Sequence, residues 1–187
     1  MSLRFAAFSF IVGLLVCGGC GAPVAKPSAQ STAPATAPAT AAASNDVQVA
    51  IGGAPEFATI LEQHQGQVVL VDFWATWCPP CVEGYPHTVE LAKKYRKQGL
   101  VGVTVSLDDP DNLDKVKTFL AENNSDLTHL LARDGASTET MEAFQLNEAV
   151  PHYRLYDRTG KLRQQWDGLP EDLEQQIQSL LEEKTPG

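Results

Sequence analysis

The chain has 187 residues, of which 43% are hydrophobic and 20% charged, and its formal net charge is −9. This composition is typical of one globular domain with a hydrophobic core, and an acidic balance without a long basic run excludes an electrostatic nucleic-acid interface. The four cysteines form two close pairs, Cys17 with Cys20 and Cys78 with Cys81, which are too few and too clustered for a small disulfide-stapled scaffold.

The N-terminal residues resemble a bacterial lipoprotein signal. Arg4 precedes the apolar run FAAFSFIVGLLV (5–16), which is too short to span a bilayer and is followed by small residues. In such signals, cleavage occurs just before a cysteine that then receives lipid. Cys20 follows two glycines and fits this role better than Cys17, which follows the bulky Val16. We therefore predict a signal peptide over 1–19 and lipidation of Cys20, with simple secretion as the alternative.

The segment that follows Cys20 is almost wholly Ala, Pro, Ser and Thr. Such a composition cannot bury enough apolar surface to offset the entropy of ordering, and its prolines stiffen the chain. Residues 20–46 are therefore predicted to be the lipidated cysteine with a semi-extended tether, and residues 47–187 to be the folded domain.

Helical and strand-like patterns alternate within the folded domain. The hydrophobic spacing predicts helices over 55–65, 79–97, 108–123, 137–146 and 170–183, and strands over 68–74, 100–107, 127–132, 152–157 and 161–166. This order predicts an α/β layer sandwich around a mixed sheet that ends in a hairpin.

The stretch VVLVDFWATWCPPC (68–81) places two cysteines directly after a buried strand. Cys78 falls where the strand ends and a helix begins, so unpaired backbone N–H groups and the helix dipole lower the pKa of its thiol and make it the attacking nucleophile. Cys81, three residues on, lies on the same helix face and is the resolving thiol. Pro79 and Pro80 are tolerated in a first helical turn and stiffen the pair.

Zinc binding and a static disulfide are the competing interpretations of this pair. A structural zinc site needs two further thiol or imidazole ligands at recognisable spacing, whereas the histidines are scattered along the chain at His64, His87, His129 and His152. A static disulfide between residues so close in sequence constrains the unfolded chain little. The pattern therefore favours a redox-active dithiol, and we expect no metal in this site.

The segment VDFWATWCPPC resembles the active-site segment of thioredoxins. With its export signal and long middle section, the chain resembles the membrane-anchored thioredoxin-like group that includes TlpA, ResA and CcmG. The resemblance implies a thioredoxin-like three-layer sandwich, with a central mixed β-sheet flanked by helices and an inserted helix and strand over roughly 110–131. It also implies a thiol–disulfide oxidoreductase that needs no cofactor beyond the Cys78–Cys81 pair.

The resemblance assigns roles to further residues. It makes Asp72 a buried acid near the resolving cysteine, where a raised pKa lets it take the proton of Cys81; an edge position with a hydrogen-bonded partner is the alternative. It makes Pro151 a cis-proline that faces the dithiol, with the backbone of Val150 pairing with an extended substrate, whereas a strand-edge proline is the alternative.

The substrate surface is expected to include Trp77, Pro79 and Pro80, with Trp77 exposed and Trp74 packed in the core. Two positions depart from the family. His152 stands where relatives usually have threonine; we expect it to face solvent, the alternative being a residue that tunes the thiolate or completes a Cys–Cys–His copper site. Many relatives carry a glutamate three residues after the second cysteine, whereas this chain has Gly84 there and Glu83 one place earlier.

These observations predict a monomeric, lipid-anchored thiol–disulfide oxidoreductase on the periplasmic side of the cell envelope, on either the inner or the outer membrane. Resemblance favours reduction of client proteins, for example in cytochrome c or copper-site maturation, with electrons from a membrane thiol-reducing transporter. The motif itself does not fix the direction of electron flow. The competing function is a copper chaperone or carrier that uses Cys78, Cys81 and His152.

Overall fold

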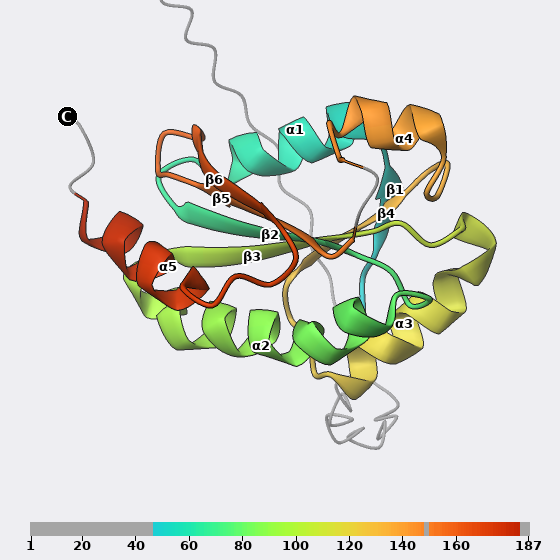
Figure 1. Ribbon diagram of the computed structural model, residues 1–187, viewed down its shortest axis with the longest axis horizontal. Helices are drawn as coiled ribbons and strands as arrows, with labels where there is room; N and C mark the ends of the chain where they lie inside the picture. Colours follow the sequence, from blue (N-terminus) through green and yellow to red (C-terminus); the bar gives the residue numbers. More distant parts are fainter. Residues whose placement is uncertain (1–46, 148–149, 184–187) are drawn as a thin grey trace, which may run out of the picture. The chain divides into compact units, whose positions relative to one another are not determined.

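The structure is a computed structural model that describes residues 47–147 and 150–183. The described residues alternate between strands and helices as the sequence predicts (Figure 1). In chain order the elements are β1 (Ala50–Gly52), α1 (Ala54–Gln63), β2 (Val68–Trp74), α2 (Pro79–Tyr95), η1 (Arg96–Gln98), β3 (Leu100–Ser106), η2 (Pro110–Asn112), α3 (Leu113–Glu122), β4 (Thr128–Ala132), α4 (Thr138–Ala143), β5 (His152–Tyr156), β6 (Leu162–Asp167) and α5 (Leu173–Glu182).

The strands form one mixed sheet in the order β1-β4-β3-β2-β5-β6. The neighbours β1, β4, β3 and β2 run parallel, whereas β5 is antiparallel to both β2 and β6. Helices α1 and α4 cover one face of the sheet, and α2, α3 and α5 cover the other (Figure 1). The predicted three-layer sandwich with a terminal hairpin is confirmed, and β2 lies at its centre.

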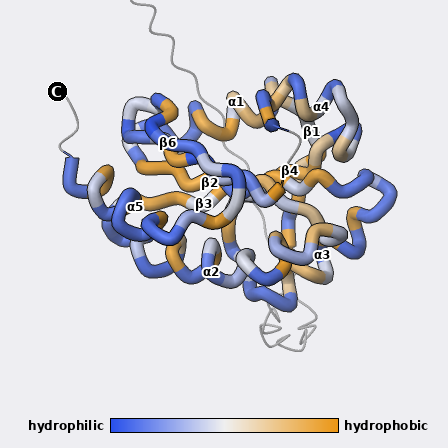
Figure 2. The backbone as a smooth tube through the Cα atoms, viewed as in Figure 1, coloured by the Kyte–Doolittle hydropathy of each residue, from blue (hydrophilic) through white to orange (hydrophobic). Residues whose placement is uncertain are grey.

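Strand β2 is buried along its whole length, which explains its nearly continuous apolar sequence. Because successive side chains of a strand point to opposite faces, Val69 and Phe73 join the core beside α1 and α4, whereas Val68 and Leu70 join the core beside α2 and α5. Figure 2 shows the central strands β2 and β3 as mainly hydrophobic. The end of β2 is therefore a rigid platform for the loop that carries the cysteines.

Several boundaries differ from the sequence-based expectation. The three-residue strand β1 was not predicted, and the helix expected from residue 108 is a 3-10 turn, η2, followed by α3. Helix α2 continues through Pro86 as one helix to Tyr95, before a short 3-10 turn that ends at Gly99 in the left-handed conformation. The inserted helix and strand are present as α3 and β4.

The predicted signal peptide, Cys20 and the tether lie outside the described residues. Within the described ranges, no helix is both long and apolar enough to cross a membrane.

Candidate active site

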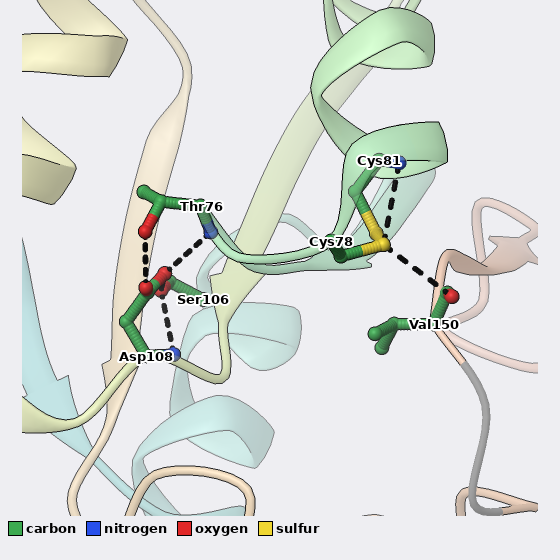
Figure 3. The surroundings of a disulfide bond; sticks show 6 residues. All are labelled: Thr76, Cys78, Cys81, Ser106, Asp108 and Val150. Atoms are coloured by element: carbon green, nitrogen blue, oxygen red, sulfur yellow. Dashed lines mark hydrogen bonds between the residues drawn. A yellow bond between two sulfur atoms is a disulfide. The ribbon is translucent and has the colours of Figure 1, made fainter.

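The two cysteines lie where β2 passes through a short loop into α2. They form a disulfide, with their Cα atoms 5.3 Å apart. Cys78 is the N-cap residue of α2, and its sulfur accepts a hydrogen bond of 3.3 Å from the backbone N–H of Cys81 (Figure 3). Pro79 and Pro80 fill the first helical turn, where their missing N–H groups leave no bond unmade. An N–H directed at the sulfur stabilises negative charge there, which suits Cys78 to act as a thiolate.

The peptide bond between Val150 and Pro151 is cis, as the resemblance implies. The carbonyl oxygen of Val150 lies 3.5 Å from the sulfur of Cys78, so this segment faces the disulfide across the active site (Figure 3). The carbonyl oxygen of Pro151 accepts a 2.7 Å hydrogen bond from the N–H of Gly168, which ties the segment to the end of β6. Two elements that are distant in sequence thus meet at Cys78.

A groove of about 780 Å³ opens beside Cys78. Trp77, Pro79, Pro80 and Val150 line it on the dithiol side, and Leu107 after β3, the helix α4 and the residues on either side of α4 line the rest. Trp77 is 53% exposed, as predicted for a contact surface, whereas Trp74 is fully buried. Cys78 is 5% exposed and Cys81 only 1%. The groove can therefore bring a substrate to Cys78, while Cys81 lies behind it.

The loop before Cys78 is held by a buried carboxylate that the sequence analysis did not single out. Asp108 is 1% exposed and accepts hydrogen bonds from the backbone N–H of Thr76 at 2.9 Å, from the Thr76 hydroxyl, and from the Ser106 hydroxyl at 2.8 Å (Figure 3). The signal in the sequence was an acid directly after a buried strand, because the ends of the neighbouring parallel strands β2 and β3 meet at one edge of the sheet. Asp108 fixes the approach of the chain to the dithiol.

Asp72 lies in the middle of the sheet rather than at its edge. It is 1% exposed, and its Oδ2 accepts a hydrogen bond of 2.7 Å from the hydroxyl of Thr88 on α2. Burial raises the pKa of Asp72 to about 7, against the hydrogen bond from Thr88 and the nearby hydroxyl group of Tyr153, both of which favour the ionised form. A carboxyl group with this pKa can both accept and release a proton near neutral pH.

The expectation that His152 faces solvent is wrong. His152 is 1% exposed; its Nδ1 lies 2.7 Å from Oδ1 of Asp167, and its Nε2 accepts a 3.2 Å hydrogen bond from Nε of Arg154. Its ring packs edge-on against Phe73 in the core beside α1 and α4. Burial lowers the pKa of His152, so the ring is neutral at pH 7.

This environment does not favour the proposed Cys–Cys–His copper set. Both ring nitrogens of His152 already have protein partners, and neither is free to bind a metal. Among the described residues, no group of three or more His, Cys, Asp or Glu side chains is arranged to hold a metal ion.

The structure explains why glycine stands at position 84, where many relatives carry a glutamate. Glu83 is exposed, whereas Gly84 is buried on α2 and packs under Tyr153. A Cβ atom at Gly84 would lie 3.3 Å from the hydroxyl oxygen of Tyr153. The space beside α2 is therefore occupied by a phenol from β5.

A dithiol at the start of a helix, opposite a cis-proline and on a mixed sheet, defines a thioredoxin-like thiol–disulfide oxidoreductase. The chain belongs to the Redoxin family, whose model matches residues 31–177.

Its relatives agree with this class. The thiol-disulfide oxidoreductase ResA of Geobacillus thermodenitrificans is 30% identical over 143 residues, which cover 71% of this chain and 79% of the relative. ResA of Bacillus thuringiensis subsp. konkukian is 29% identical over 126 residues, covering 67% and 68%. A crystal structure described as a thiol:disulfide interchange protein DsbE, from Chlorobium tepidum, superposes with a TM-score of 0.56 at 33% identity, covering 65% of this chain and 84% of that one. The chain is thus a thioredoxin-like protein of the ResA and CcmG type.

Proposed function

We propose that this protein is a lipid-anchored reductase of client disulfides on the periplasmic side of the cell envelope. The observation that carries this proposal is the position of Cys78, whose sulfur accepts the N–H of Cys81 and lines the open groove, while Cys81 is buried behind it. This arrangement gives a client disulfide access to one sulfur only.

In the proposed reaction, the Cys78 thiolate attacks one sulfur of the client disulfide. A mixed disulfide forms and the other client sulfur leaves with the electron pair as a thiolate. Cys81 then gives its proton to Asp72 and attacks the sulfur of Cys78. The bond between Cys78 and Cys81 forms as the bond to the client breaks, so the client gains two electrons and the protein becomes oxidised.

The client is held by the surface around Cys78. An extended client segment lies along the backbone of Val150, beside Pro151, and contacts the exposed ring of Trp77 and the rings of Pro79 and Pro80. The protein acts as a monomer and uses no cofactor beyond its dithiol. A membrane thiol-reducing transporter regenerates the dithiol, and apocytochrome c or copper-site proteins are the client class favoured by the resemblance to TlpA, ResA and CcmG.

The direction of electron flow is tested by equilibrating the protein in graded thiol redox buffers and following the fluorescence of Trp77. A reduction potential near that of thioredoxin, about −270 mV, supports a dedicated reductase. A potential close to that of the strong oxidant DsbA, about −120 mV, would instead identify an oxidant of envelope proteins.

Lipid attachment at Cys20 rests on the sequence of the signal and is tested separately. Cells that express the protein are fed a fatty acid carrying a reporter group, and the label on the protein is compared between wild type, Cys20→Ser and the matched control Cys17→Ser. We expect the label to be lost only in Cys20→Ser. Equal labelling of wild type and Cys20→Ser would contradict the anchor.

A further inference from the structure

A buried tyrosine lies beside the aspartate that the proposed reaction uses. Tyr153 on β5 is the register partner of Asp72 on β2, so both side chains point to the face of the sheet that α2 covers. Tyr153 is fully buried and Asp72 is 1% exposed. Among the described residues, neither the Tyr153 hydroxyl nor Oδ1 of Asp72 has a hydrogen-bond partner in the oxidised protein. A buried donor and a buried acceptor that lie side by side without partners gain free energy by pairing with each other.

The position of the phenol connects it to the resolving cysteine. Its oxygen lies over Gly84, where an added Cβ atom would be 3.3 Å away. Gly84 follows Cys81 by three residues and precedes Thr88 by four, so all three share one face of α2. Thr88 already donates to Oδ2 of Asp72, which leaves Oδ1 for the phenol.

The other polar groups around Asp72 do not compete for this role. Thr104 on β3 is the second register partner of Asp72, but its hydroxyl lies 2.8 Å from Nδ1 of His129 on β4. Tyr85 on α2 shares a hydrogen bond of 3.0 Å with Ser125. Burial lowers the pKa of His129 to about 4 and raises the pKa of Tyr85, so both are neutral at pH 7. Helix α5 contributes apolar side chains to this layer.

We propose that Tyr153 is a positioning residue for the resolving step, because its hydroxyl donates a hydrogen bond to Oδ1 of Asp72 when that carboxyl group is ionised. This inference rests on the proposed role of Asp72. The phenol stabilises the carboxylate that receives the Cys81 proton, and Tyr153 keeps its own proton throughout. Burial raises the pKa of Tyr153, so it serves as a hydrogen-bond donor and not as an acid.

The test follows the resolving step as a function of pH. The reduced full-length protein is mixed with an aromatic disulfide whose thiolate product absorbs light, and stopped flow separates the attack of Cys78 from the slower release caused by Cys81, from about pH 5 to about pH 9. In Tyr153→Phe, the carboxylate of Asp72 loses a hydrogen-bond donor, so its pKa rises. The midpoint, the pH at which the release phase reaches half of its maximal rate, therefore moves upward by roughly one pH unit. The attack phase keeps its wild-type rate.

Tyr156→Phe is the matched control. Tyr156 lies on the same strand and is 7% exposed, but it is three residues from Tyr153, so its ring points to the opposite face of the sheet and packs against Phe57 of α1. Its substitution removes a buried phenol hydroxyl without contact to Asp72, and the midpoint should stay at the wild-type value. A midpoint that moves equally in Tyr153→Phe and Tyr156→Phe would overturn the inference, because it would reflect a general loss of packing.

Asp72→Asn separates this inference from the proposed reaction. If Asp72→Asn keeps the wild-type pH profile, the role of Asp72 fails. If Asp72→Asn abolishes the pH dependence of the release phase but Tyr153→Phe leaves the midpoint at the wild-type value, only the role of Tyr153 fails. If Tyr153→Phe does not fold, Gly84→Ala serves instead, because its Cβ pushes on the phenol oxygen. The midpoint is then expected to move away from the wild-type value, and an unchanged midpoint in a folded Gly84→Ala overturns the inference.

Discussion

Replacing Asp72 by asparagine should stabilise the protein at alkaline pH. Burial raises the pKa of Asp72 in the folded protein from 3.8, the value of an exposed aspartate, to about 7. A difference of this size corresponds to at most about 4 kcal/mol between the protonated and ionised states. Because the side chain is fully buried and bonded only through Thr88, we expect about 2 to 4 kcal/mol to be realised.

The sign follows from which state holds the proton. Between about pH 4 and pH 7, the folded protein keeps the proton of Asp72 while the unfolded chain has lost it. The contribution of protonated Asp72 to the free energy of unfolding is therefore fully present below about pH 4, falls as the pH rises, and is lost above about pH 7. Asparagine does not titrate. The stability difference between Asp72→Asn and wild type should thus shift in favour of the variant as the pH rises from 4 to 8.

Urea unfolding of the oxidised proteins at several pH values measures this difference, and titrations of other groups cancel because both chains share them. Asp108→Asn is the matched control. Asp108 is an equally buried aspartate, but its carboxylate accepts hydrogen bonds from Thr76 and Ser106, so its substitution should destabilise the protein by about 1 to 3 kcal/mol. A stability difference for Asp72→Asn that stays constant with pH would refute the reasoning.

Two further substitutions test the surface and the core around the dithiol. Trp77→Ala should change the free energy of unfolding by less than about 0.5 kcal/mol, because the ring is exposed. The same substitution should raise KM for a protein disulfide but not for a small aromatic disulfide. Equal effects on both substrates would argue against a client surface at Trp77. His152→Leu should destabilise the protein by about 1 to 3 kcal/mol, because Asp167 and Arg154 lose a partner. Reduced His152→Leu should bind copper with the same affinity as the wild type, whereas weaker binding by the variant would support the carrier function.

Much of the fold could be predicted because local patterns agree with the tertiary structure. The run Val68–Trp74 is apolar because both faces of β2 are covered, and the helices show their buried faces at regular spacing. Strand β1 could not be predicted from three residues, since only its pairing with the distant β4 defines it.

The candidate site, like the fold, could be predicted only in part from the sequence. The dithiol follows from a short motif and the cis-proline from the resemblance to thioredoxins, but the support from Asp108 depends on a contact between residues 32 positions apart. The orientation of His152 was mispredicted for a related reason. The sequence of β5 alternates His152 and Arg154 with Tyr153 and Leu155, a pattern that marks the His152 face as outward. The structure buries this polar face as well, because Arg154 donates hydrogen bonds to the backbone directly after α4.

The roles of the two cysteines are tested most directly by trapping the mixed disulfide. Cys81→Ser is reduced, mixed with a protein client that contains a disulfide, and the covalent adduct is mapped by mass spectrometry; Cys78→Ser is treated in the same way. We predict an adduct through Cys78 in the first variant and none in the second, because Cys78 lines the groove and Cys81 is 1% exposed. An adduct through Cys81 in Cys78→Ser, with none through Cys78 in Cys81→Ser, would contradict the assignment of Cys78 as the attacking thiol.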